Sequence, residues 1–68
     1  MDKLRNRLKD LRAARNLTQA DLAVMTLVSR KTINTIENGV FVPSTTLALK
    51  LARVLDVRVE DLFYLEGS

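Results

Sequence analysis

The sequence predicts an all-α fold of five short helices, arranged as one compact domain over residues 1–68. Three observations support this prediction. Apolar residues recur at helical spacing along most of the chain, and polar residues suited to capping stand where helices should begin. The strongest breaks in the pattern are Gly39 and Pro43, with no repeat or linker around them. We therefore expect helices joined by short turns.

The first helix is expected over residues 3–15. Asp2 can cap its start by accepting backbone N–H bonds. Leu4, Leu8 and Leu11 then recur at the spacing of one helical face, which we expect to point into the core.

The second and third helices follow one another closely. Thr18, with an acidic residue three positions later, has the pattern of a capping box and predicts a helix over about residues 19–25. Ser29 is a favourable N-cap for a third helix that ends at Asn38 and Gly39. Two short helices joined by a tight turn form the outline of a helix-turn-helix motif.

The fourth and fifth helices complete the expected fold. Ser44 caps a helix that runs to about Leu55. The last helix should start near Val59, with two acidic residues in its first turn, where the helix dipole favours them. Leu62 and Phe63 are expected to face inward from it.

The composition excludes several classes of site and protein. The chain has no cysteine and no histidine, so we expect neither a disulfide framework nor a metal site. It also lacks a glycine-rich phosphate loop, and we expect no cofactor and no enzymatic activity. No apolar run approaches the roughly 20 residues that span a bilayer, and the N-terminus lacks an apolar signal core. The expected location is the cytoplasm, without a membrane partner.

Charge is distributed unevenly along the chain. Residues 1–38 carry eight Lys or Arg against four Asp or Glu, whereas residues 39–68 carry three against four. The two parts therefore have net charges of +4 and −1. This asymmetry favours an anionic partner for the first part, although charge alone fits a solvated basic face equally well.

The predicted third helix has two different faces. At about 100° per residue, Ile33 and Ile36 point to one side. The other side and its flank carry side chains that can bond base edges or phosphates: Arg30, Lys31, Asn34, Thr35 and Asn38. A polar face is typical of any short surface helix. Its place on the second helix of a tight pair, with positive charge at its leading end, favours a DNA-recognition helix.

Four segments resemble the phage-repressor and Cro-like, or Xre-type, helix-turn-helix regulators. They are residues 18–23 (TQADLA), 28–39 (VSRKTINTIENG), 43–55 (PSTTLALKLARVL) and 59–63 (VEDLF). The likeness covers nearly the whole chain. It implies a sequence-specific regulator that binds double-stranded DNA and inserts the third helix, about residues 29–38, into the major groove. The predicted mechanism is occupancy of a palindromic operator that blocks or recruits polymerase by position; repression is the predicted outcome, and activation stays open.

The resemblance also implies roles for individual residues. The positions that face the groove in relatives are Ser29, Arg30, Lys31, Asn34 and Thr35. Gln19 matches a glutamine that contacts a phosphate and can brace the start of the recognition helix, and Asn38 matches a second phosphate contact. Arg12 and Glu37 match a salt bridge between the first and third helices. The alternative interpretation is that Arg12 and Glu37 are two unrelated surface charges. If Arg12 is left partly buried, loss of Glu37 should be the more destabilising change.

The chain departs from the family pattern in two turns. Thr26, Leu27 and Val28 occupy a turn that usually reads Leu-Gly-Val. A leucine in the left-handed conformation would cost about 1 kcal/mol or more, so either the turn has another geometry or the strain is tolerated. Asp56 likewise replaces a usual glycine after the fourth helix, and Arg58 replaces a usual Ser or Thr cap.

Apolar residues of the C-terminal third predict a symmetric homodimer. Leu49 lies about 200° around the fourth helix from Leu47, away from the core. Phe63, Tyr64 and Leu65 add more apolar area than a short last helix can bury. The alternative is that the tail folds back over Leu49 within one chain. Many antitoxins share this pattern as well, so a cognate toxin or another protein stays open as a partner.

Overall fold

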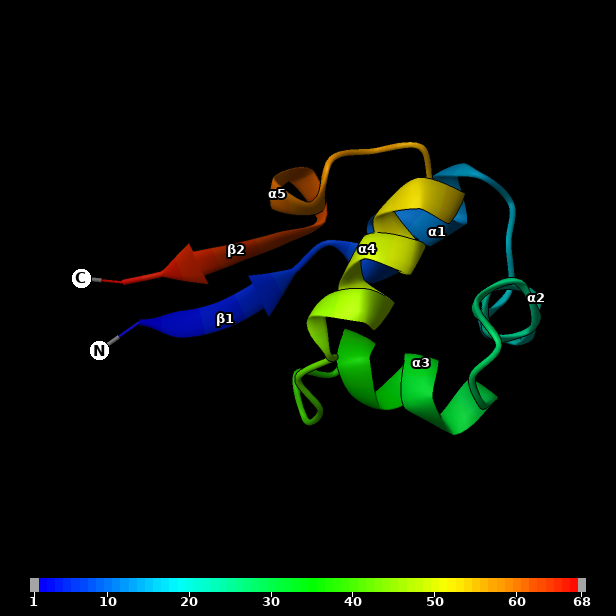
Figure 1. Ribbon diagram of the computed structural model, residues 1–68, viewed down its shortest axis with the longest axis horizontal. Coiled ribbons are helices and arrows are strands. Elements are labelled where there is room, and N and C mark those ends of the chain that lie inside the picture. Colours follow the sequence, from blue (N-terminus) through cyan, green and yellow to red (C-terminus); the bar gives the residue numbers. More distant parts are fainter. Residues whose placement is uncertain (1, 68) are drawn as a thin grey trace.

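The computed structural model describes residues 2–67, which form five helices and a two-stranded antiparallel ribbon (Figure 1). The helices are α1 (Leu8–Ala14), α2 (Gln19–Thr26), α3 (Arg30–Glu37), α4 (Thr45–Val54) and α5 (Val59–Leu62). The strands are β1 (Lys3–Asn6) and β2 (Phe63–Glu66). The five expected helices are confirmed. The all-α description is only approximate because of the ribbon.

The first predicted helix was placed too early. It begins at Leu8 rather than at residue 3, because the Asn6 side-chain oxygen accepts the backbone N–H of Leu8 at 3.1 Å and starts the helix there. Residues 3–6 are instead paired with β2, and Leu4 lies opposite Leu65. This pairing joins the two ends of the chain, so the local spacing of leucines could not reveal it.

The last predicted helix was correspondingly too long. It ends at Leu62, and Phe63, which was expected on its inward face, lies with Tyr64 in β2. Phenylalanine and tyrosine favour strands, and here a partner strand is present. The ribbon extends away from the helices in Figure 1, which gives the molecule extents of 35 × 21 × 20 Å.

The two faces of the ribbon differ in character. Leu4, Phe63 and Leu65 lie on one face, because side chains alternate along a strand. Arg5 and Tyr64 lie opposite each other on the second face. The first face borders α4, and the second is polar.

The helices share a core of nine buried apolar residues. α2 packs against both α3 and α4, and α1 contacts α3. The core residues, each at most 4% exposed, are Leu8, Leu22, Ala23, Ile33, Ile36, Leu51, Ala52, Leu55 and Leu62. The core therefore holds α3 by its isoleucine face and leaves the opposite face of that helix in solvent. None of the helices within residues 2–67 is long and apolar enough to cross a membrane.

Helices α1 to α4 are each followed by a residue in the left-handed conformation. These residues and their φ angles are Asn16 (58°), Leu27 (61°), Gly39 (73°) and Asp56 (55°). At the end of α2, the N–H of Val28 bonds the carbonyl of Ala23 at 3.0 Å, which is the pattern of a Schellman motif. Equivalent bonds close the other three ends. The chain thus uses one type of turn four times.

Leu27 settles the question that the sequence left open about the helix-turn-helix turn. Its φ of 61° and ψ of 40° are left-handed, so the turn keeps the usual geometry and the strain is tolerated. The side chain is 84% exposed, which means that little apolar packing offsets this strain. Two hydrogen bonds from the turn to α2 hold the conformation instead.

Candidate nucleic-acid interface

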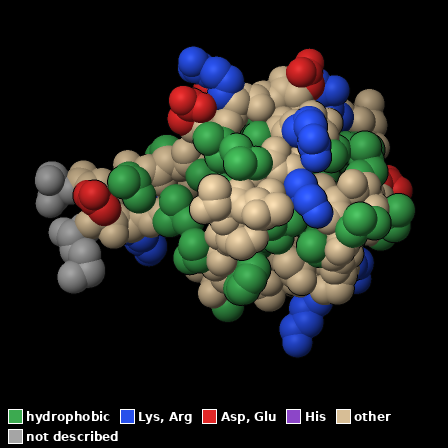
Figure 2. All heavy atoms as spheres, viewed as in Figure 1, with side chains coloured by type: hydrophobic (Ala, Val, Ile, Leu, Met, Phe, Trp, Pro, Cys, Tyr) green, Lys and Arg blue, Asp and Glu red, His purple; other side chains and the backbone are tan. Residues whose placement is uncertain are grey.

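The outward face of α3 is a polar surface anchored by a buried apolar face. Ile33 and Ile36 are at most 1% exposed, and they fix the rotation of the helix. On the other side Arg30, Lys31 and Asn34 are exposed and line a depression of about 300 Å³. The ion pairs within residues 2–67 include neither of these two cations. A Lys or Arg side chain projects from the α3 edge of the molecule in Figure 2. The face therefore presents free positive charge and hydrogen-bond donors.

Ser29 is occupied in starting this helix. Its hydroxyl oxygen accepts the backbone N–H of Thr32 at 3.1 Å and lies 2.9 Å from the Thr32 hydroxyl. Ser29 is exposed beside the proposed base-reading side chains, but its first role is that of an N-cap. Thr32 was not singled out from the sequence, and its hydroxyl completes this cap.

Gln19 connects the start of α2 to α3. Its side-chain Nε2 donates to Asn34 Oδ1 at 3.1 Å and to Glu37 Oε1 at 3.0 Å. The resemblance implied that Gln19 contacts the start of the recognition helix, whereas the two bonds observed are to its second half. Both N–H bonds of this amide are committed within the protein, so a phosphate contact through the same group requires one of them to be given up.

Asn34 is held with its amide group oriented. Its Oδ1 accepts from Gln19 and also from Asn38 Nδ2 at 3.3 Å. A carbonyl oxygen has two lone pairs, so this acceptor is fully used. The NH2 group of Asn34 is therefore what the side chain presents to solvent.

Thr35 presents a methyl group rather than a hydroxyl. Its Oγ1 donates to the backbone carbonyl of Thr32 at 3.0 Å, and the side chain is half-buried. A hydroxyl engaged with its own helix is a poor reader of a base edge, whereas a methyl group suits contact with a thymine methyl.

Arg12 and Glu37 form a buried two-bond ion pair between α1 and the end of α3. Arg12 Nε and Nη2 donate to the two carboxylate oxygens at 2.7 and 3.2 Å. Arg12 Nη1 also donates to the carbonyl of Leu17 at 2.8 Å. The hydrogen bond to Glu37 raises the pKa of Arg12, opposed by partial burial. The exposed fractions of the side chains are 14% for Arg12 and 4% for Glu37, so Glu37 is the more deeply buried partner.

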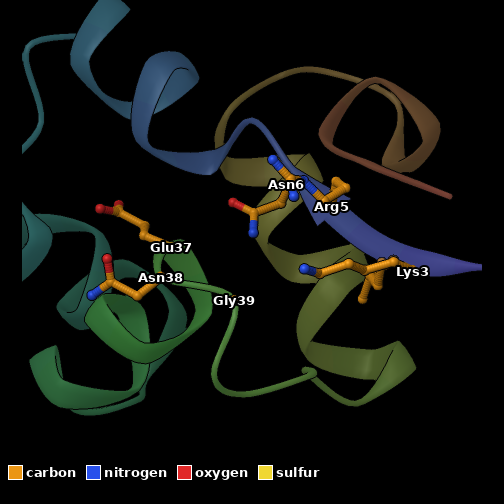
Figure 3. A pocket seen from close by; sticks show the side chains of 7 residues that line it. Lys3, Arg5, Asn6, Glu37, Asn38 and Gly39 are labelled. Atoms are coloured by element: carbon orange, nitrogen blue, oxygen red, sulfur yellow. The ribbon is translucent and has the colours of Figure 1, made fainter. Parts of the chain in front are cut away.

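The structure also places residues at α3 that the sequence did not suggest. Asn6 donates from Nδ2 to the carbonyl of Ile36 at 2.9 Å, so β1 is tied to the end of α3. Lys3 and Arg5 lie near the same end of α3 (Figure 3). An asparagine two residues before a leucine-rich helix is a capping pattern, and this signal could have identified Asn6.

The residues expected in a dimer interface lie on two surfaces. Leu49 is 54% exposed and Leu65 is 64% exposed. Phe63 is half-buried and, with Leu49, borders an apolar groove of about 230 Å³. Tyr64 points to the other face of the ribbon, where the Arg7 guanidinium lies 4.8 Å from its ring centre. The tail pairs with β1 and leaves Leu49 half-exposed.

Comparison with known proteins identifies the family. A family model described as helix-turn-helix matches residues 8–62. An uncharacterized HTH-type transcriptional regulator of Methanocaldococcus jannaschii is 49% identical over 65 residues, which is 96% of this chain and 98% of that protein. The HTH-type transcriptional regulator YgzD of Bacillus subtilis is 40% identical over 63 residues, covering 93% and 96% of the two chains.

Two solved structures share the fold. The restriction-modification controller protein C.AhdI from Aeromonas hydrophila has a TM-score of 0.76 and 34% identity, covering 81% of this chain and 83% of that one. A putative DNA-binding protein from Bacteroides fragilis has a TM-score of 0.82 and 28% identity, covering 90% and 98%. With the two-helix motif, its exposed donor face and these relatives in agreement, the chain belongs to the Xre-type helix-turn-helix family of DNA-binding transcriptional regulators rather than to an enzyme family.

Proposed function

We propose that this chain represses transcription by occupying a palindromic operator, with α3 inserted in the major groove. The observation that carries the proposal is the exposed face of α3, where Arg30 and Lys31 are free of ion pairs within the described residues and Asn34 is held in one orientation. A helix of this size fits the major groove, and bound protein blocks polymerase by position.

The side chains divide into base readers and positioning residues. Arg30 and Lys31 are suited to the N7 and O6 acceptors of guanine. With its oxygen occupied, Asn34 offers donors and suits the same acceptors better than the paired donor and acceptor of adenine. Thr35 offers its methyl group to thymine. Asn38, at the end of the helix, is placed for a phosphate.

Selection of bound sequences from random duplex DNA tests this division. Arg30→Ala, Lys31→Ala and Asn34→Ala should each relax the preference at one or two positions, at a cost of about 1–3 kcal/mol for the lost base contact. Arg15→Ala is the control, because Arg15 pairs with Asp56 on another side of the molecule. Equal losses on selected and random duplexes for the first three variants would contradict base reading.

A homodimer is part of the same proposal, because one short helix reads few base pairs. The exposed Leu49 and Leu65, with the apolar groove between Leu4 and Phe63, form a surface that a second copy would cover. In a two-fold arrangement each copy contributes the same patch. The two recognition helices should then lie about 34 Å apart and meet half-sites one turn apart.

Sedimentation measurements test the dimer. Leu49→Glu should yield a folded monomer with greatly weakened operator binding, because it places a charge in the proposed interface. Val24→Glu is a matched control, since Val24 is 75% exposed on α2 and outside the patch. Wild-type protein that remains monomeric at high micromolar concentration and binds a single half-site would refute the dimer.

A further inference from the structure

A crevice of about 260 Å³ lies between β1 and the C-terminal end of α3 (Figure 3). Its polar lining consists of Lys3, Arg5, Asn6, Glu37 and Asn38. Figure 3 shows Lys3 and Asn6 extending from the strand toward the end of the helix. Two segments far apart in the sequence therefore build one polar crevice at the end of the recognition helix.

Three acceptor groups in or beside this crevice are already engaged. Glu37, the one carboxylate in its lining, accepts from Arg12 and Gln19. The Asn6 side-chain oxygen accepts the Leu8 N–H. The carbonyl of Ile36 at the helix end is also occupied, by the Asn6 amide and the Gly39 N–H. With these acceptors engaged, the side-chain groups left for a ligand are mainly the donors of Lys3 and Arg5, beside the amide of Asn38.

The cations of the crevice are available. Lys3 is exposed and forms no ion pair within residues 2–67. Arg5 has one contact, at 3.6 Å, with Glu66, and both side chains are about half-exposed. An exposed pair of this kind contributes little and exchanges easily for a stronger anion. The crevice is thus suited to a compact anion with several acceptor oxygens, such as a phosphate group.

The crevice is continuous with the face of α3 that is proposed to read DNA. Asn38 lines the crevice and donates to Asn34 on that face. We infer that the crevice binds a backbone phosphate next to the bases that α3 contacts, with Lys3 as its main cation and Arg5 and Asn38 beside it. This inference rests on the proposed DNA-binding mode and adds β1 to it.

Strand pairing makes such a contact more effective than a free terminus would. β1 is held by its register with β2, in which Lys3 lies opposite Glu66, and by the hydrogen bond from Asn6 to α3. The backbone that carries the cation is therefore ordered before DNA arrives, and less backbone conformational entropy is lost on binding. A phosphate contact carries no sequence information itself, so its role is to fix the register of α3 on the duplex.

Salt titration of operator binding tests the inference. Lys3→Gln and Arg5→Gln are compared with Arg15→Gln, which makes the same change in net charge at an exposed residue away from α3. Loss of one phosphate contact should make the slope of log affinity against log salt shallower by about 0.9. Between about 50 and 200 mM salt, wild-type affinity should then fall about threefold more than that of Lys3→Gln. The selected sequence should stay the same for all variants.

A duplex with single methylphosphonate linkages locates the contact. Neutralising one phosphate beside the α3 site should weaken wild-type binding and leave Lys3→Gln binding nearly unchanged, whereas Arg15→Gln should respond as the wild type does. Thermal unfolding of each variant shows whether the ribbon is intact. If wild type binds its operator and Lys3→Gln keeps the wild-type salt slope and phosphate profile, the crevice is not a contact. If wild type selects no sequence at all, the proposed function fails first.

Discussion

The buried ion pair between Arg12 and Glu37 gives the sharpest prediction for stability. Arg12→Met removes the guanidinium and keeps an apolar stem of similar length. The Glu37 carboxylate, only 4% exposed, would then keep Gln19 as its one remaining partner. Removing one member of a buried pair costs about 3–5 kcal/mol. A chain of this size has a total stability of about 3–10 kcal/mol, so the variant should be close to unfolding.

The companion variants separate loss of the pair from loss of packing. Glu37→Met should cost less, because Arg12 is 14% exposed and retains its bond to the Leu17 carbonyl. This order is the reverse of the one that the sequence predicts for the case in which Arg12 is left partly buried. The double variant Arg12→Met, Glu37→Met should recover most of the loss, since an apolar pair leaves no buried charge unmatched.

Urea unfolding followed by circular dichroism measures all four proteins in one thermodynamic cycle. The expected result is a coupling energy of about 2 kcal/mol or more between the two positions. A loss below about 1 kcal/mol for Arg12→Met, or a double variant as unstable as the sum of the single variants, would refute the reasoning.

Four further variants test local features of the fold by unfolding. Leu27→Gly should raise the free energy of unfolding by about 0.5 kcal/mol, since left-handed strain of about 1–2 kcal/mol outweighs the extra unfolded-state entropy of glycine. Gly39→Ala should lower the free energy of unfolding. A change of the same sign in both variants would contradict the assignment of strain to these turns. Hydrogen bonds from the Thr18 backbone and then its side chain lower the pKa of Asp21. Their stabilisation is present above the ordinary aspartate pKa and is lost as pH falls through the lower folded value, so Asp21→Asn should show a shallower loss of stability in acid. Asn6→Ala should cost about 1–2 kcal/mol, because it removes the side-chain bond to the Leu8 N–H before α1 and the bond to α3; an unchanged melting temperature would show that β1 is not tied to α3.

Local patterns predicted the middle of the chain well. The caps at Thr18, Ser29 and Ser44 are all present, each accepting a backbone N–H three residues later. The isoleucine face of α3 is buried as its spacing indicated. These features depend on residues within a turn or two of each other, and that is the range over which sequence periodicity carries information.

The ends of the chain could not be predicted in the same way. Residues 3–6 and 63–66 form strands because they pair with each other across the whole sequence. Leu4 fits the leucine spacing of α1, so the local pattern favoured a helix where long-range pairing produced a strand. The matched family region, residues 8–62, excludes both strands. The resemblance therefore predicted the helices and gave no indication of the ribbon or of the crevice beside it.

The orientation of Asn34 is likewise a property of the folded chain rather than of its helix alone. Arg12 holds Glu37, Glu37 accepts from Gln19, and Gln19 donates to Asn34. Each bond fixes the next side chain, so the donors that Asn34 presents depend on a largely buried salt bridge between α1 and α3. A change at Glu37 should consequently alter stability and also release the amide of Gln19. The family resemblance predicted the Arg12–Glu37 pair and a contact from Gln19 to the recognition helix, and the fold shows that these contacts continue to Asn34 in series.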